Sequence, residues 1–414
     1  WRISVERSAY ERAMELLESD KHPGRIRGKD AFHVTQNSPW DWASIRLTEN
    51  KACIFLEEDN SCYWHRHFGG ETKGWVCRSY PNSAQILPDS TLVDGCLSCP
   101  PMAEALVDTY AGPMRLIDVG TDAFAAALLQ PRFQVTAEHV IVFGHNRLIM
   151  ADALELLIET LLEFLHIGGV SLGAQLLMGR LFLMRLAETT SETLLTRDHI
   201  QRQMAALESD ATAIYLDAQE MLTPMNGSDA LRAMLIRTFV FRANALGVAS
   251  NRVPALGRVI TQLHLNASET EAGQQLALLH RTWFEPTPHL AAALTAYGCH
   301  RLIKLQSLAL GGVAAAYAEA LFAMMLVWAY ALADADMQGI AVNPDLLKAA
   351  MVEVEATFFH SASFRTFLKH EEEGGIASLY TVQTAALMTT PFVTLHHDPE
   401  AIQAMLPRGP EAGC

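Results

Sequence analysis

The sequence from Leu308 to Ala333 is LALGGVAAAYAEALFAMMLVWAYALA, and this apolar stretch decides the fold more than any other. It is long enough to cross a membrane. It is also rich in alanine, carries Glu319 near its middle, and lacks a flanking cluster of Lys or Arg that would orient it in a bilayer. We therefore expect a buried core helix, with a membrane helix as the alternative. We also expect Gly311-Gly312 to divide the segment from His289 to Ala333 into two helices.

Helical periodicity extends to both sides of this stretch. Between Leu148 and Leu165 an apolar stripe lies opposite Glu155, Glu159 and Glu163, which recur every four residues as one helix face requires. Similar patterns predict helices at 171–187, 199–221, 229–245, 258–265, 273–284 and 343–359. We therefore predict a large all-α domain over residues 121–405, followed by a disordered tail at 406–414.

The first 120 residues have a different composition, rich in Gly, Pro, Asn, Asp and aromatic residues. Ser8 and Glu11 have the spacing of a capping box and predict a helix that follows a short strand within residues 1–20. Short alternating runs at 31–35 and 44–48 predict strands, and Pro100-Pro101 predicts the start of a helix. The fold class we predict is mainly α, with a small cysteine-rich α+β module at residues 1–120 before the helical domain.

Five of the seven cysteines crowd into this module, as Cys53-x8-Cys62-x14-Cys77-x18-Cys96-x2-Cys99. Converging thiolates bind zinc or iron–sulfur clusters, and four ligands are usual. The spacing predicts a metal site but does not choose between zinc and iron–sulfur. Free buried cysteines are the alternative explanation. His65 and His67 could also supply ligands, although we expect them at the surface of a hairpin.

The formal net charge of −15 argues against a nucleic-acid partner, which requires a basic surface. The odd number of clustered cysteines does not suit a disulfide scaffold in so long a chain, so we expect a reducing, cytoplasmic compartment. No signal peptide is visible, and the chain begins with Trp1 instead of Met, so we expect further sequence upstream.

The residues around the cysteines form a recognisable series. They are Cys53-Ile-Phe-Leu, Cys62-Tyr-Trp-His, Gly69-Gly70, Cys77-Arg-Ser-Tyr-Pro81 and Ser98-Cys99-Pro-Pro-Met-Ala. This series resembles the cysteine module of the flagellin lysine-N-methylase family. Trp1-Arg-Ile-Ser-Val-Glu resembles the segment that follows a paired-cysteine motif there, and 301–304 and 322–364 resemble the C-terminal half. Cys96 is a departure from the family pattern, which requires only the cysteine before proline.

The resemblance implies a [4Fe–4S] enzyme that moves a methyl group from S-adenosylmethionine to the ε-amine of flagellin lysines. It implies Cys53, Cys62, Cys77 and Cys99 as cluster ligands, with Cys96 as a further candidate metal ligand. No residue is assigned as catalytic base. The alternatives are a non-enzymatic zinc- or iron-binding module joined to a helical interaction body, and an iron–sulfur electron carrier.

Overall fold

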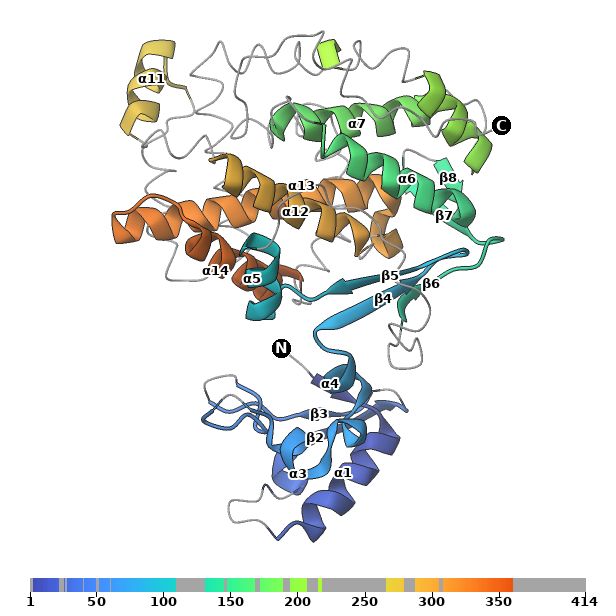
Figure 1. Ribbon diagram of the computed structural model, residues 1–414, viewed down its shortest axis with the longest axis vertical. Helices are drawn as coiled ribbons and strands as arrows, with labels where there is room; N and C mark the ends of the chain where they lie inside the picture. The colour runs from blue at the N-terminus through green and yellow to red at the C-terminus, as the bar shows by residue number, and fades with distance from the viewer. Residues whose placement is uncertain are drawn as a thin grey trace. The chain divides into compact units, whose positions relative to one another are not determined.

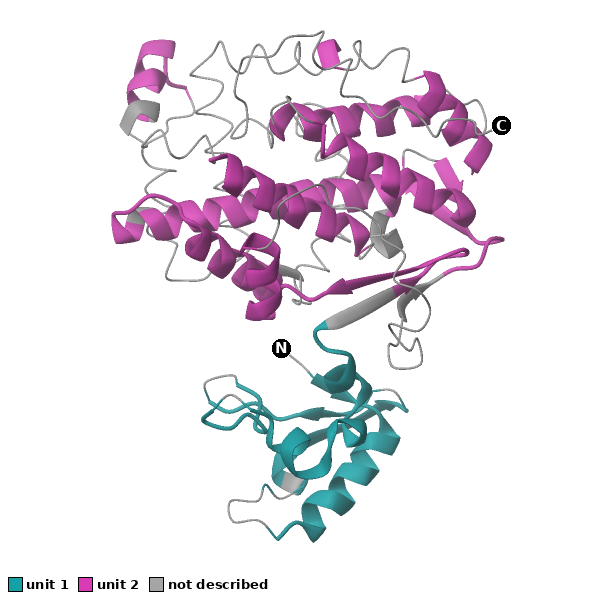
Figure 2. Ribbon diagram, in the orientation of Figure 1, with its two compact units in different colours: residues 1–84, 118–132 teal, residues 85–117, 133–414 magenta. Residues whose placement is uncertain are grey.

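A computed structural model describes residues 3–21, 26, 28–39, 41–49, 52–59, 61–108, 131–144, 147–167, 172–188, 194–206, 215–217, 266–278, 287–304 and 308–359. These residues are mainly helical and form three small sheets (Figure 1). The chain divides into two compact units (Figure 2). Unit 1 comprises residues 1–84 and 118–132, and unit 2 comprises residues 85–117 and 133–414. The units therefore separate first after Ala84, earlier in the chain than the boundary at residue 120 that we expected.

Unit 1 contains a three-stranded antiparallel sheet of order β1-β3-β2. Its elements are β1 (Ile3–Val5), α1 (Arg7–Ser19), α2 (Gly28–Ala31), β2 (Phe32–Ser38), β3 (Asp41–Ile45), α3 (Tyr63–Phe68), η1 (Gly70–Thr72) and α4 (Trp75–Ser79). Helix α1 buries Ala9, Ala13 and Leu17, which share one face because they are four residues apart. The predicted capping box is wrong, because α1 already begins at Arg7 and Glu11 pairs with that residue at 2.7 Å.

The remaining strands lie wholly or partly in unit 2. Two of them fall within the predicted α+β module: β4 (Asn82–Ile86, shared with unit 1) and β5 (Thr91–Gly95). The prediction of an all-α domain from residue 121 did not anticipate the others, which are β6 (Pro131–Gln134, also shared with unit 1), β7 (Val140–Gly144), β8 (Arg147–Met150) and β9 (Leu194–Leu195). Together these strands form two sheets, of order β5-β4-β6 and β7-β8-β9. These strands are short, and an alternating pattern of only four or five residues is a weak sequence signal.

The helices of unit 2 follow the predicted order. They are α5 (Pro100–Asp108), α6 (Ala151–Phe164), α7 (Leu172–Glu188), α11 (Glu269–Leu278), α12 (Pro288–Ile303), α13 (Leu308–Gln338) and α14 (Pro344–Val354), followed by a π-helical turn, η4 (Glu355–Phe359). Asn343 caps α14, because its side chain accepts hydrogen bonds from the backbone N–H groups of Asp345 and Leu346. The helices predicted at 229–245 and 258–265, and the tail at 406–414, lie outside the described residues.

Helix α13 lies at the centre of unit 2, where α7, α12, α14 and β7 pack against it (Figure 1). Its segment Gly312–Ala335 is long and apolar enough to cross a membrane, but its apolar window is entirely buried within the protein. This burial agrees with the prediction of a core helix. Gly312 has a non-helical backbone and kinks α13, which confirms the predicted break.

The kink at Gly312 requires glycine for two reasons. The residue has φ = 80° and ψ = −166°, a conformation that side chains with a Cβ rarely adopt, and a Cβ there would collide with the backbone carbonyl of Val142 on β7. We expect Gly312→Ala to lower the free energy of unfolding by more than the ~1–3 kcal/mol that backbone strain alone costs. Chemical denaturation would measure this change.

Gly339 provides the matched control for that substitution. It also has a positive φ, of 66°, but an added Cβ would meet nothing within 4 Å. Gly339→Ala should therefore cost backbone strain alone and destabilise the protein less than Gly312→Ala. Equal losses in the two variants would show that the close approach to Val142 does not matter.

Candidate functional site

Three of the predicted metal ligands, Cys53, Cys62 and Cys77, lie in unit 1 and pack beside its apolar core. The rings of Phe32, Phe55 and Trp64 form the centre of that core, with centroids 5.2–5.9 Å apart. All three thiols are partly buried. The fold of unit 1 therefore brings cysteines that are up to 24 positions apart in the sequence to one small core.

Local pairing explains how the first two cysteines are positioned. Cys53 forms an antiparallel bridge with Leu47, and Cys62 forms one with Leu56. The Glu57 N–H donates to the Ser61 carbonyl at 2.9 Å and closes the predicted turn between the two cysteines. Cys77 lies on α4, whose first N–H, from Trp75, donates to the Glu6 carboxylate at 3.1 Å.

The three thiols influence one another electrostatically. Burial raises the pKa of the Cys77 thiol to about 12, and the neighbouring Cys53 and Cys62 add to this shift, while Lys73 opposes it. Burial also raises the pKa of Cys53, with a further contribution from Cys62. Thiols with a raised pKa stay protonated more readily, so a metal ion that binds these cysteines must displace their protons. Lys73 favours the thiolate form of Cys53 and Cys77.

The thiol chemistry of these residues fits a soft metal, but their arrangement is not a closed site. Within the described ranges, no group of three or more His, Cys, Asp or Glu side chains is placed to hold a metal ion. His65 and His67 lie on the short helix α3, so the expected hairpin placement is wrong for both. The side chain of His65 is exposed, and the ring of His67 lies against that of Tyr63, with centroids 4.3 Å apart and a tilt of 43°.

The other two predicted ligands, Cys96 and Cys99, belong to unit 2, in the connection from β5 to α5. The Cys99 N–H donates to the Cys96 carbonyl at 3.0 Å, which closes a tight turn. The Cys96 thiol is buried, and its sulfur lies 3.0 Å from the Ser98 hydroxyl. The membership of Cys96 and Cys99 in a common ligand set with the three cysteines of unit 1 stays a prediction.

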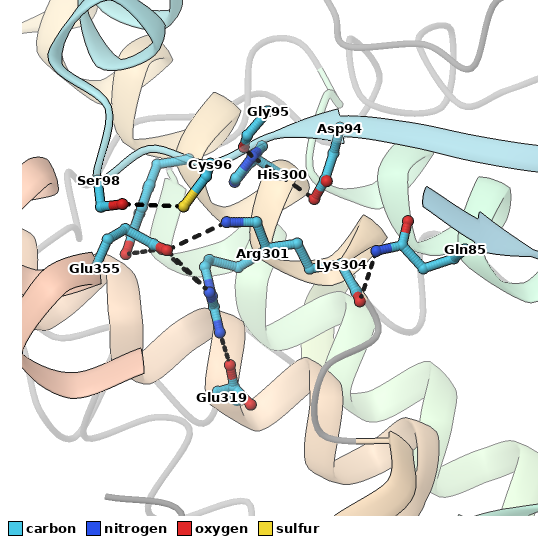
Figure 3. Close-up of polar contacts among 11 residues, drawn as sticks. Gln85, Asp94, Gly95, Cys96, Ser98, His300, Arg301, Lys304, Glu319 and Glu355 are labelled. Atoms are coloured by element: carbon cyan, nitrogen blue, oxygen red, sulfur yellow. Dashed lines mark hydrogen bonds and ion pairs between the residues drawn. The ribbon is translucent and has the colours of Figure 1, made fainter. Parts of the chain in front are cut away.

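Unit 2 also contains a buried cluster of charged residues centred on Arg301 (Figure 3). The Arg301 guanidinium donates to Glu355 at 3.1 Å and pairs with Glu319, and the side chain has no exposed surface. Lys304 Nζ lies 3.2 Å from Glu355, and the Tyr297 hydroxyl donates to the same carboxylate at 3.0 Å. Glu355 opens the π-helical turn η4, and π-helical turns recur at functional sites.

These groups compensate one another's charge. Burial alone would raise the pKa of Glu355, but Arg301 and Lys304 hold it well below its ordinary value. Burial opposes the charge of Arg301, but Glu355 and Glu319 raise its pKa above the usual range. Burial also raises the pKa of Glu319, although Arg301 opposes that shift. Two cations and two carboxylates therefore form a compact ionic group inside the helical core.

Helix α12 also contacts strand β5 through His300. The His300 Nε2–H donates to the Gly95 carbonyl, and this nitrogen lies 3.9 Å from a carboxylate oxygen of Asp94. Burial, followed by the charge of Lys304, lowers the pKa of His300 well below its ordinary value. The lowered pKa favours the neutral imidazole, and a carbonyl partner requires its proton on Nε2.

Sequence analysis missed most of this cluster. Glu319 was visible as a carboxylate within an apolar helix, and Arg301 and Lys304 lie three residues apart in another apolar segment. Charged residues at such positions signal a buried ion pair.

Comparison with known proteins does not identify a family for this chain. No family model, curated protein or solved structure matches this chain.

Proposed function

We propose that this protein is an iron–sulfur-dependent protein lysine N-methyltransferase that methylates flagellin with S-adenosylmethionine in the cytoplasm. In this proposal the chain is built as a small cysteine-rich α+β module followed by a mostly helical body. The observation that carries the proposal is the placement of Cys53, Cys62 and Cys77 beside one core. These cysteines belong to the sequence motifs that resemble those of the flagellin lysine-N-methylases.

The residues that would hold a [4Fe–4S] cluster are Cys53, Cys62 and Cys77, with Cys99 as the fourth predicted ligand. When bound, such a cluster supplies an iron that can accept the amino and carboxylate groups of the methyl donor. The chain itself contributes Lys73, whose positive charge favours the thiolate form of two of these cysteines. Methyl transfer also requires a neutral amine, so the protein must remove a proton from the substrate lysine.

A structural metal centre without catalytic activity is the second candidate. Unit 1 has a small core of short elements and aromatic rings, and small modules of this kind commonly depend on metal for folding. A thiol-bound zinc ion would serve that purpose as well as a cluster would. The metal and the activity must therefore be measured separately.

The test combines metal analysis with a methylation assay. We expect anaerobically purified protein to be brown, to absorb at about 400 nm and to contain iron and sulfide, as thiolate-bound clusters do. It should transfer labelled methyl groups from S-adenosylmethionine to flagellin, but not to flagellin whose lysines have been acetylated. A colourless protein with one zinc per chain and no transfer would support the structural centre instead. A brown protein that transfers no methyl groups would support the iron–sulfur electron carrier.

A further inference from the structure

Helix α4 carries Cys77, and it is too short to hold its own orientation. It spans only Trp75–Ser79, whereas isolated helices of fewer than about 12 residues are at best marginally stable in water. The first N–H groups of any helix also need partners from outside the helix. The position of the Cys77 thiol therefore depends on the contacts that the rest of unit 1 makes with α4.

Glu6 makes the contact at the start of α4. Both of its carboxylate oxygens accept the Trp75 N–H, at 3.2 Å and 3.1 Å, across 69 positions of sequence. A carboxylate is favourable there because the N-terminus of a helix carries partial positive charge. Only 8% of Glu6 is exposed, and Arg78 Nη2 lies 3.9 Å from the same carboxylate. The carboxylate is therefore buried against α4 with partners for its charge.

The backbone of Glu6 is fixed from two sides. Glu6 directly follows strand β1 and caps α1, where its carbonyl accepts the Tyr10 N–H at 2.9 Å. Strand β1 is paired with β3 in the sheet of unit 1. The Glu6 side chain therefore reaches α4 from a position that the sheet and α1 both define.

Gly74 makes the close approach of this carboxylate possible. The residue precedes α4 with φ = −59°, so its backbone does not require glycine. An added Cβ at Gly74 would lie 3.2 Å from Glu6 Oε2 and 3.4 Å from Val5 Cγ1, so one of these neighbours would have to move. Glycine at this position therefore lets the Glu6 carboxylate contact the first turn of α4.

We infer that Glu6 is a positioning residue for the metal centre of unit 1, because its carboxylate orients α4 and keeps Cys77 beside Cys53 and Cys62. The inference rests on the proposed function only for the existence of that centre, and it applies equally to a cluster and to a zinc ion. The Glu6 charge adds to the raised pKa of the Cys77 thiol and so opposes its thiolate form. The contribution we infer is therefore orientation and not charge.

The test measures Co²⁺ binding to the full chain by chelator competition, because thiolate-to-cobalt charge-transfer absorption reports how many thiolates bind. Glu6→Ala should weaken binding at least about tenfold and should show the reduced absorption of Cys77→Ser. Glu6→Gln keeps an oxygen that accepts the Trp75 N–H, so its affinity should stay within about threefold of the wild type. Equal losses in Glu6→Ala and Glu6→Gln would overturn the inference.

A double variant distinguishes positioning from general destabilisation. If Glu6 acts through Cys77, adding Glu6→Ala to Cys77→Ser should weaken Co²⁺ binding by less than about twofold beyond Cys77→Ser alone. The same loss in both backgrounds would contradict the inference. If Glu6→Ala does not fold, Gly74→Ala in the two backgrounds replaces it. Asn343→Ala is the matched control, because it removes the cap of α14 in unit 2 and should leave Co²⁺ affinity unchanged.

Co²⁺ binding is measured without methyl donor and without flagellin. A protein whose Co²⁺ affinity depends on Glu6 in this way, but which methylates nothing, would reject the proposed enzyme and leave this inference intact. A protein that methylates flagellin, while Glu6→Ala keeps the Co²⁺ affinity and thiolate absorption of the wild type, would do the reverse.

Discussion

Replacement of Arg301 by methionine is expected to lower the free energy of unfolding by about 3–5 kcal/mol. Arg301 pairs with both Glu319 and Glu355 inside the helical core, and its side chain has no exposed surface. Methionine would fill much of the same volume but would leave two buried carboxylates, with Lys304 as the remaining cation paired to them among the described residues. Urea or guanidinium denaturation followed by circular dichroism would measure the loss.

Two further variants separate buried charge from the loss of a side chain. The double variant Arg301→Met with Glu319→Leu removes one carboxylate together with its partner, so it should recover part of the stability. Lys348→Met removes ion pairs to Asp108 and Asp345 that lie at the surface, and should leave the denaturation midpoint nearly unchanged. If Arg301→Met were as stable as Lys348→Met, the ionic group would have no role in holding α12, α13 and η4 together.

The helical part of the fold could be predicted because its signals are local. The periodic glutamates predicted α6, the glycine pair predicted the kink in α13, and the pattern at 343–359 predicted α14. Strands β4 and β5 are short, and they depend on pairing within their sheet and, for β5, on packing against α12. Their sequences contain no comparable local signal.

The two candidate sites also differ in how far the sequence could predict them. The density of cysteines indicated a metal site directly, but their spacing could not show that unit 1 contains only three of the five. Glu319 was visible within an apolar run. Its partner Arg301 is 18 residues away on another helix, and Glu355 is a further 36 residues beyond Glu319. Such a cluster is created by tertiary packing, and a single sequence does not specify which buried charges will meet.

The largest effect we expect comes from the cysteines of unit 1. In the proposed enzyme, Cys77→Ser should remove the iron, sulfide and colour and should unfold unit 1, because metal binding to small modules contributes on the order of 10 kcal/mol to folding. Serine is nearly the same size as cysteine, but it is a poor ligand for a soft metal. Burial already raises the pKa of the Cys77 thiol to about 12, so without a metal this side chain remains a neutral thiol.

Controls within the chain make this prediction specific. Cys99→Ser should also lose the cluster if Cys99 is the fourth ligand, while Cys299→Ala should retain it, because Cys299 is buried on α12 within the apolar core of unit 2. Metal analysis and limited proteolysis of unit 1 would be compared across the three variants. Full iron content in Cys77→Ser would reject the ligand assignment. If Cys77→Ser lost its iron while Cys99→Ser kept its full iron content, Cys99 would not be a ligand of the metal centre.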